Sequence, residues 1–248
     1  MQPFIRFENV HKSFDKNEVY KGLSLDIIRG ETLTIIGGSG TGKSVMLKML
    51  LGLIPADRGR IFFDGQEVTK MEGESLIKMR RRIGMLFQGA ALFDSMSVAE
   101  NVAYPLVEVG DPKRLKRPYQ DIVQEKLEMV GLPDKGEIMP ADLSGGMKKR
   151  VGLARAIATD PEVILYDEPT TGLDPTNTRR INELILELQE KLKVTSLVVT
   201  HDMASAFTVS NRLALVNNKK IEFVGTVEEV KRSQNEVVKK FINGEIGE

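Results

Sequence analysis

The chain of 248 residues contains no cysteine, and its basic and acidic side chains balance at 35 each. The absence of cysteine excludes disulfide bonds, thiolate metal sites and a cysteine nucleophile, and it is compatible with a reducing cytoplasm. The balanced charge gives no electrostatic reason to expect a nucleic-acid partner or a polybasic contact with a membrane. With 41% hydrophobic residues, the chain has ample material for the core of one large domain or two small ones.

Long apolar runs are also missing. The longest lies within Met49–Ala56, far short of the roughly 20 residues that span a bilayer as a helix. The first ten residues lack a basic region followed by an apolar core, so we expect no secretory signal there. If the protein acts at a membrane, another protein is expected to cross it.

Glycines instead gather in one stretch, residues 37–44, which reads GGSGTGKS and follows the apolar run 32–36. The stretch fits G-x-x-x-x-G-K-[ST], the phosphate-cradling P-loop, between a predicted strand and a predicted helix from Val45 onward. Glycines let backbone N–H groups converge on phosphate oxygens, and the helix N-terminus favours the anion. Lys43 is expected to reach the β- and γ-phosphates, and the Ser44 hydroxyl to coordinate Mg²⁺. The predicted nucleotide-binding residues are Gly37, Gly38, Ser39, Gly40, Thr41, Gly42, Lys43 and Ser44.

Two acids, Asp167 and Glu168, end the predicted buried strand that begins at Val163. In P-loop enzymes an acid at this place completes the Mg²⁺ site, which favours Asp167 as a metal ligand. Glu168 is then a candidate general base for the attacking water. Surface charge is the alternative, and the P-loop upstream favours the functional interpretation.

Four further features each leave two interpretations open on local grounds. Phe14 is a half-buried strand residue or a platform for adenine, and residues 91–93 are core or a docking surface. Ser144, before two glycines at a helix start, is an N-cap or part of an anion site. His201, after the apolar strand 195–200, is structural or contacts a γ-phosphate.

The order of patterns predicts an α/β fold. Alternating strands over residues 4–30 favour an antiparallel β subdomain, and apolar strands followed by helices favour a mixed or parallel sheet with flanking helices. Residues 90–158 are predominantly helical in pattern and are interpreted as an inserted α-helical subdomain. Within it, residues 108–118 read as a polar surface connection.

Seven motifs stand in order along the chain: Phe14, residues 37–44, Gln88, LSGGM at 143–147, LYDE at 165–168, GLD at 172–174 and His201. With them the sequence resembles the ATP-binding subunits of ABC transporters over essentially its whole length. The resemblance implies one ABC ATPase domain, with a RecA-like core and β subdomain over 1–89 and 159–225. The helical subdomain would be 90–158 and a helical tail 226–248.

The resemblance also assigns roles. Phe14 would stack on adenine, Gln88 would contact Mg²⁺ or the attacking water, Glu168 would be the catalytic base and His201 would sense the γ-phosphate. The residues expected to act across a head-to-tail homodimer around two ATP·Mg are Ser144, Gly145 and Gly146, with Asp174 at the seam. Met147 departs from the family's usual glutamine, but the signature serine and glycines carry the expected phosphate contacts, so we expect hydrolysis to survive.

Residues 87–106, 143–158 and the tail look like the ATPases of Mla/Mce-type bacterial lipid transport systems. That likeness implies an integral permease contacting residues 89–106, an Mce-domain lipid-binding protein, phospholipid cargo and a place at the cytoplasmic face of the bacterial inner membrane. The nearest rival is the ATPase of an amino-acid or other small-solute importer. A soluble ABC ATPase acting on DNA or ribosomes would be expected to show coiled-coil insertions, two ATPase domains or excess basic charge, and a plain P-loop kinase would not need LSGGM.

Overall fold

The computed structural model describes residues 2–109 and 117–245, which divide into two compact units. Unit 1 holds the described residues up to Met79 together with those from Thr195 onward, and unit 2 is Arg80–Val194. Helix α2 (Gly73–Arg81) crosses the boundary in sequence. Most of the polar connection expected at 108–118 lies outside the described residues. The expected division into core, helical subdomain and tail stays a prediction.

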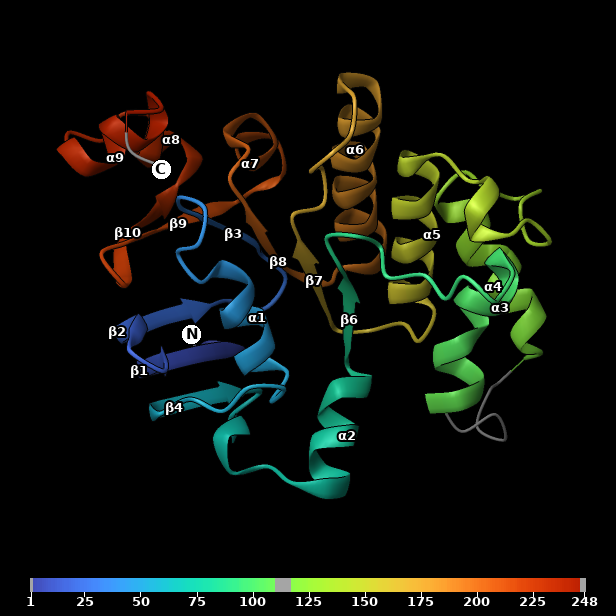
Figure 1. Ribbon diagram of the computed structural model, residues 1–248, viewed down its shortest axis with the longest axis horizontal. Helices are drawn as coiled ribbons and strands as arrows, with labels where there is room; N and C mark the ends of the chain where they lie inside the picture. Colours follow the sequence, from blue (N-terminus) through green and yellow to red (C-terminus); the bar gives the residue numbers. More distant parts are fainter. Residues whose placement is uncertain (1, 110–116, 246–248) are drawn as a thin grey trace. The chain divides into compact units, whose positions relative to one another are not determined.

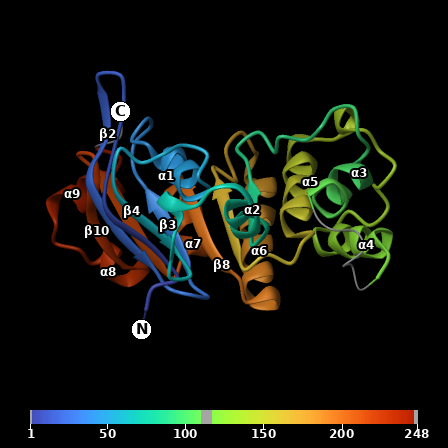
Figure 2. The same cartoon turned by 90° about the horizontal axis from the view of Figure 1, so that it is seen from below.

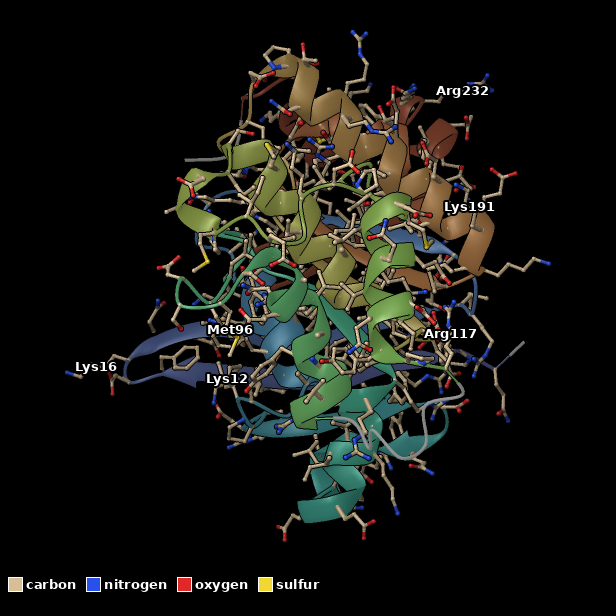
Figure 3. The ribbon with its side chains drawn as sticks, turned by 90° about the vertical axis from the view of Figure 1, so that its right-hand side faces the viewer. Lys12, Lys16, Met96, Arg117, Lys191 and Arg232 are labelled. Atoms are coloured by element: carbon tan, nitrogen blue, oxygen red, sulfur yellow. The ribbon has the colours of Figure 1, made fainter. Side chains whose placement is uncertain are left out.

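Unit 1 contains an antiparallel sheet in the order β2-β1-β4-β5, which confirms the predicted β subdomain (Figure 1). Its strands are β1 (Ile5–Phe14), β2 (Asn17–Ile27), β4 (Arg58–Phe63) and β5 (Gln66–Glu67). β1 and β2 form the long hairpin seen from below in Figure 2, and Lys16 at its tip extends away from the strands in Figure 3. Alternate side chains of the hairpin, including Phe7 and Leu25, are buried on the core side.

The second group of unit 1 strands is mostly parallel. β3 (Thr32–Ile36) lies between β8 (Thr195–Thr200) and β9 (Arg212–Asn217) and pairs parallel with both, and β10 (Lys220–Thr226) adds an antiparallel edge to β9. All residues of β3 and β8 are buried, as expected for strands covered on both faces. The carboxyl ends of β3 and β8 therefore meet at one edge, where the 37–44 loop and His201 follow them.

Short helices complete unit 1. Helix α1 (Lys43–Leu50) follows the P-loop and contacts β8, and η1 (Val68–Lys70) follows β5. Helix α7 (Met203–Val209) is N-capped by Asp202. Helices α8 (Val227–Lys231) and α9 (Glu236–Ile242) bury Val227, Val230 and Val238 against residues from β3, β9 and α7.

Unit 2 combines two parallel strands with a group of helices. β6 (Ile83–Leu86) pairs parallel with β7 (Val163–Asp167). The sequence of residues 83–88, IGMLFQ, favours a buried strand that ends in Gln88, but β6 ends two residues earlier and Gln88 lies in a turn. The helices are α3 (Val98–Tyr104), the π-helix η2 (Pro105–Val109), α4 (Tyr119–Met129), η4 (Pro140–Asp142), α5 (Gly145–Ile157) and α6 (Pro175–Leu192).

Helix α5 is central to unit 2: it contacts α3, α4, α6 and β6, and Figure 1 shows it standing between α6 and the α3/α4 pair. Gly84 permits the approach to β6, because a Cβ there would lie 2.1 Å from the Ala156 carbonyl oxygen of α5. Helix α5 thus begins within the LSGGM motif and packs against β6, the strand that precedes Gln88.

Helix starts follow the chemistry expected from the sequence. Ser97 caps α3 in a reciprocal capping box with Glu100, and Asp174 caps α6 with Pro175 at the first helical position. From the sequence, Ser97 is expected to cap a helix that runs to about Val107. The start is right, but the regular α-helix ends at Tyr104, before Pro105 opens the π-helix.

Candidate functional site

The P-loop of unit 1 curls around its own lysine. Lys43 is only 6% exposed, and its ammonium donates to the carbonyl oxygens of Gly37 (2.8 Å) and Gly38 (3.0 Å). Gly40 and Gly42 have φ of 74° and 93°, the left-handed region that only glycine enters without strain. Gly42 is also the N-cap of α1 without a side-chain cap, so the first N–H groups of the helix are not covered by a capping side chain.

Strand β2 packs against the P-loop. The Tyr20 hydroxyl, on β2, donates to the Gly42 carbonyl oxygen at 2.7 Å, and Tyr20 is fully buried. Burial raises the pKa of Tyr20, so the phenol stays a neutral donor. A Cβ on Gly42 would lie 2.3 Å from Cγ1 of Val19. The tight fit to β2 was not predicted from the sequence, which showed only an ordinary alternating strand.

Phe14 ends β1 with 42% of its surface exposed, so its ring is available to a planar ligand. One side of the ring faces the Lys12 ammonium, 5.1 Å from the ring centroid. Lys12 is itself nearly buried and forms an ion pair with Asp57 at 2.8 Å, while the Ser13 N–H donates to the other oxygen of that carboxylate. The Lys12 contact lowers the pKa of Asp57. These contacts fix the strand end that presents Phe14, and sequence reasoning missed them.

His201 follows the last residue of β8 and is exposed. The next residue, Asp202, is fixed on both sides: its N–H donates to the Thr200 hydroxyl at 3.0 Å and its carboxylate caps α7. His201 therefore sits on a short, ordered corner at the same sheet edge as the P-loop of unit 1.

In unit 2, Asp167 is the last residue of β7 and Glu168 the first beyond it, with 7% and 9% exposure. Glu168 has φ of 48°, a left-handed conformation that costs a non-glycine residue roughly 1 kcal/mol. Its carboxylate accepts a hydrogen bond from the Thr171 hydroxyl at 3.1 Å, and its carbonyl oxygen accepts one from the Lys149 ammonium at 2.9 Å. Burial of this acid pair excludes the plain surface-charge interpretation.

Gln88 is exposed in the turn after β6. The turn continues through Ala90 and Ala91, two consecutive non-glycine residues with φ of 61° and 49°. The guanidinium of Arg155, on α5, donates to both of their carbonyl oxygens at 2.8 Å. Of the apolar stretch that follows, Phe93 is 40% exposed and pairs with Tyr104 at a centroid distance of 4.6 Å. The open question about residues 91–93 is thus resolved toward exposure for Phe93.

The LSGGM motif places Ser144 as the N-cap of α5, its hydroxyl accepting the Met147 N–H at 3.3 Å. The two glycines differ in surroundings. Gly145 is exposed, and a Cβ there would come no closer than 3.8 Å to Cδ2 of Leu173, whereas a Cβ on Gly146 would lie 2.3 Å from Oδ1 of Asn177. Gly146 therefore permits close packing on α6, and Gly145 leaves backbone open at a helix N-terminus.

Asp174 accepts backbone hydrogen bonds from Thr176 and Asn177 and one from the Asn177 side chain at 2.5 Å. The bond from the Asn177 N–H is the main cause of its lowered pKa. Its structural role as the cap of α6 is shown, and its place at a dimer seam stays a prediction.

The residues of unit 1 fit a nucleotide triphosphate. The left-handed glycines, an N-terminus of α1 that has no side-chain cap and a buried lysine are the features of a phosphate cradle. Among the described residues, no three His, Cys, Asp or Glu side chains gather into a metal cluster. None of the described helices is long and apolar enough to cross a membrane.

Comparison with known proteins identifies the family. Residues 20–171 match the family model described as ABC transporter. The "Probable ribonucleotide transport ATP-binding protein mkl" of Mycobacterium leprae is 40% identical over 240 residues, 97% of this chain and 69% of that protein. The "Intermembrane phospholipid transport system ATP-binding protein MlaF" of Haemophilus influenzae is 39% identical over 98% of this chain and 92% of its own length. The "Methionine import ATP-binding protein MetN" of Carboxydothermus hydrogenoformans is 40% identical over 92% and 67%.

Solved structures agree. A dimeric ATP-binding cassette in a post-hydrolysis state, bound to ADP and Pi, superposes with a TM-score of 0.81 at 31% identity, covering 90% of this chain and 98% of that one. The α/β fold predicted from the sequence is thereby confirmed, and so is the need for ATP and Mg²⁺. The chain belongs to the ABC transporter family and is an ATP-hydrolysing, ATP-binding subunit of it.

Proposed function

We propose that this chain drives lipid transport across a bacterial envelope, with phospholipid as the cargo. The observation that carries the lipid branch is the match to the phospholipid-transport relative, which runs over 98% of this chain and 92% of that protein. The match to the methionine-import relative covers only 67% of that protein's length. The likeness of the 87–106 and 143–158 stretches to Mla/Mce ATPases points the same way.

The proposal assigns a role to each site residue. Lys43 and the loop N–H groups bind phosphate, Phe14 stacks on adenine, and Ser44, Gln88 and Asp167 hold Mg²⁺. Glu168 accepts a proton from the water that attacks the γ-phosphorus, and His201 contacts that phosphate. The burial of Glu168 and its two hydrogen bonds support this role, because a general base must be held in one orientation.

The proposal also assigns partners. Two copies pack head to tail around two ATP molecules, with Ser144, Gly145 and Gly146 contributing to the nucleotide of the partner copy and Asp174 at the seam. The exposure of Ser144 and Gly145 at the start of α5 supports this, as does the dimeric state of the solved relative. We place the dimer at the cytoplasmic face of the inner membrane, on an integral permease that is joined to an Mce-domain protein.

A groove in unit 2 fits the permease. It has a volume of about 800 Å³ and lies between α3 with the segment after it and α4 with the 136–139 segment. Val107, Tyr119 and Met139 line it with 36%, 38% and 37% of their surfaces exposed. One wall lies within or just after residues 89–106, the region expected to meet the permease. A groove lined by exposed aromatic and aliphatic side chains together with polar ones such as Glu100 and Gln124 suits an amphipathic segment of a partner.

The test is affinity purification of the tagged chain from detergent-solubilised membranes of the source organism, with proteins and lipids identified by mass spectrometry. Recovery of a permease, an Mce-domain protein and phospholipid is the expected result. A permease recovered with a solute-binding protein would move the assignment to methionine or another small solute, the alternative that the methionine-import relative supports. Recovery without any membrane protein would refute a transport role.

The groove is tested in the same purification. Val107→Glu places a charge on the groove wall and is expected to release the permease while leaving ATP binding intact. Leu53→Glu is the matched control, because Leu53 is also an exposed aliphatic residue, at 54%, but belongs to unit 1. Equal permease recovery with both variants would contradict the groove as the docking site.

A further inference from the structure

Lys149 is a buried cation that the P-loop, signature and acid-pair motifs do not account for. It lies one turn into α5 and is only 4% exposed, although an ammonium group is among the costliest to remove from water. Its ammonium donates to the backbone carbonyl oxygen of Glu168 at 2.9 Å. Burial is also the main cause of its lowered pKa, and the carboxylates of Asp167 and Glu168 act in the opposite direction.

The backbone of Glu168, which accepts this hydrogen bond, has an unusual conformation. Glu168 has φ of 48°, and this left-handed turn directs the chain out of β7 into the segment that leads to α6. The same carbonyl oxygen lies 3.3 Å from the Thr171 N–H, a long and weaker contact. Of these two contacts to the Glu168 carbonyl oxygen, the hydrogen bond from the charged donor on α5 is the shorter.

The opposite end of Glu168 is also held. Its carboxylate accepts the Thr171 hydroxyl at 3.1 Å. Fixing a side chain at its carboxylate and at its backbone leaves little freedom to its χ angles. This is the arrangement that catalysis by proton transfer needs, since a shift of about 1 Å in a reacting group lowers rates by roughly a hundredfold.

We propose that Lys149 is a positioning residue for Glu168: from α5 it holds the left-handed peptide that aims the carboxylate at the attacking water. Lys149 does not contact the nucleotide in this account and leaves nucleotide affinity unchanged. Because Ser144 is the N-cap of α5, the orientation of Glu168 also depends on the helix that carries the LSGGM motif. The inference rests on the proposed role of Glu168 as general base.

The test compares ATP turnover of Lys149→Met with that of Lys149→Gln. Methionine keeps the length of the chain but has no donor, and glutamine keeps an N–H donor without the charge. Lys148→Met is the matched control, because Lys148 is the neighbouring, half-buried lysine of the same helix. Glu168→Gln is measured alongside. Phosphate release gives kcat and KM for ATP, and thermal unfolding reports the fold.

We expect Lys149→Met to lower kcat by at least about tenfold, with KM and the unfolding midpoint near those of Lys148→Met. Lys149→Gln should recover part of the lost kcat. An unchanged kcat in Lys149→Met overturns the proposal. A lowered kcat also overturns it if Lys149→Gln shows the same loss and both variants have a lowered unfolding midpoint, because the loss then reports damage to the fold. If Glu168→Gln itself turns over ATP at the normal rate, the failure lies in the base assignment and not in Lys149.

Discussion

Arg155 is expected to be the main support of the strained turn after Gln88. Its guanidinium makes two hydrogen bonds of 2.8 Å to the carbonyl oxygens of Ala90 and Ala91. Each hydrogen bond from a charged donor contributes roughly 1.5 kcal/mol or more to stability. Without them, Ala90 and Ala91, with φ of 61° and 49°, would each retain a left-handed strain of about 1 kcal/mol that nothing offsets.

Arg155→Met removes both donors while keeping an unbranched apolar stem. Partial relaxation of the turn recovers some of the lost energy, so the expected decrease in the free energy of unfolding is about 2 kcal/mol rather than the full sum of the two bonds. Local hydrogen exchange should accelerate in peptides covering residues 87–93. Because Gln88 stands at the start of the turn, ATP turnover should fall as well.

The assay is urea unfolding combined with amide hydrogen exchange, with Arg179→Met on the exposed face of α6 as the control. Adding Ala91→Gly to Arg155→Met should restore roughly 0.5–1 kcal/mol, because glycine adopts the left-handed region without strain. The account of this turn is refuted if Arg155→Met is no less stable than Arg179→Met and exchange at residues 87–93 is unchanged.

Three further predictions concern the rest of the site. Gly146→Ala should destabilise the protein by about 1–3 kcal/mol, because the added Cβ would lie 2.3 Å from the Asn177 side chain. Gly145→Ala is the control and should leave the unfolding midpoint unchanged; equal midpoints for the two variants would contradict the packing of α5 on α6. Tyr20→Phe removes the hydrogen bond to the Gly42 carbonyl oxygen, so it should lower the free energy of unfolding by about 1 kcal/mol and weaken ATP binding measured by calorimetry. Unaltered ATP binding would show that the P-loop keeps its shape without this hydrogen bond. Lys12 lowers the pKa of Asp57 from the ordinary 3.8, so the ionised carboxylate stabilises the fold above that pH, and this contribution is lost as the pH falls through the folded pKa. The unfolding midpoint of Asp57→Asn should therefore depend less on pH between about 5 and 2 than that of the unaltered chain; parallel curves would refute the linkage.

The sequence was sufficient for the elements whose signals are local. The glycine pattern placed the P-loop, the Ser97 and Asp174 caps placed two helix starts, and continuous apolar runs placed β3, β7 and β8. Helix α7 was not predicted, although Asp202 before Ala204 and Ser205 carried a capping signal. Its brevity, Met203–Val209, left too little periodicity for recognition.

The supports of the site could not be predicted in this way. Lys149, Arg155 and Lys12 act through partners that lie 19, 64 and 45 positions away in the sequence. Each looked like one more basic residue on an amphipathic element, and only the fold shows that its charged end is turned toward a backbone carbonyl or, for Lys12, toward the carboxylate of Asp57. Positive φ at Ala90, Ala91 and Glu168 was equally hidden, since no glycine marks those positions.

The most direct test of the central claim is phosphate release from ATP by the purified chain, alone and with its co-purified membrane partners, for the unaltered protein and for Glu168→Gln. The account predicts Mg²⁺-dependent hydrolysis by the unaltered chain, and near-complete loss in Glu168→Gln with retained ATP binding and an ATP-dependent dimer. Lys43→Ala should instead lose nucleotide binding. Hydrolysis at the normal rate by Glu168→Gln would contradict the assignment of the catalytic base and the mechanism built on it.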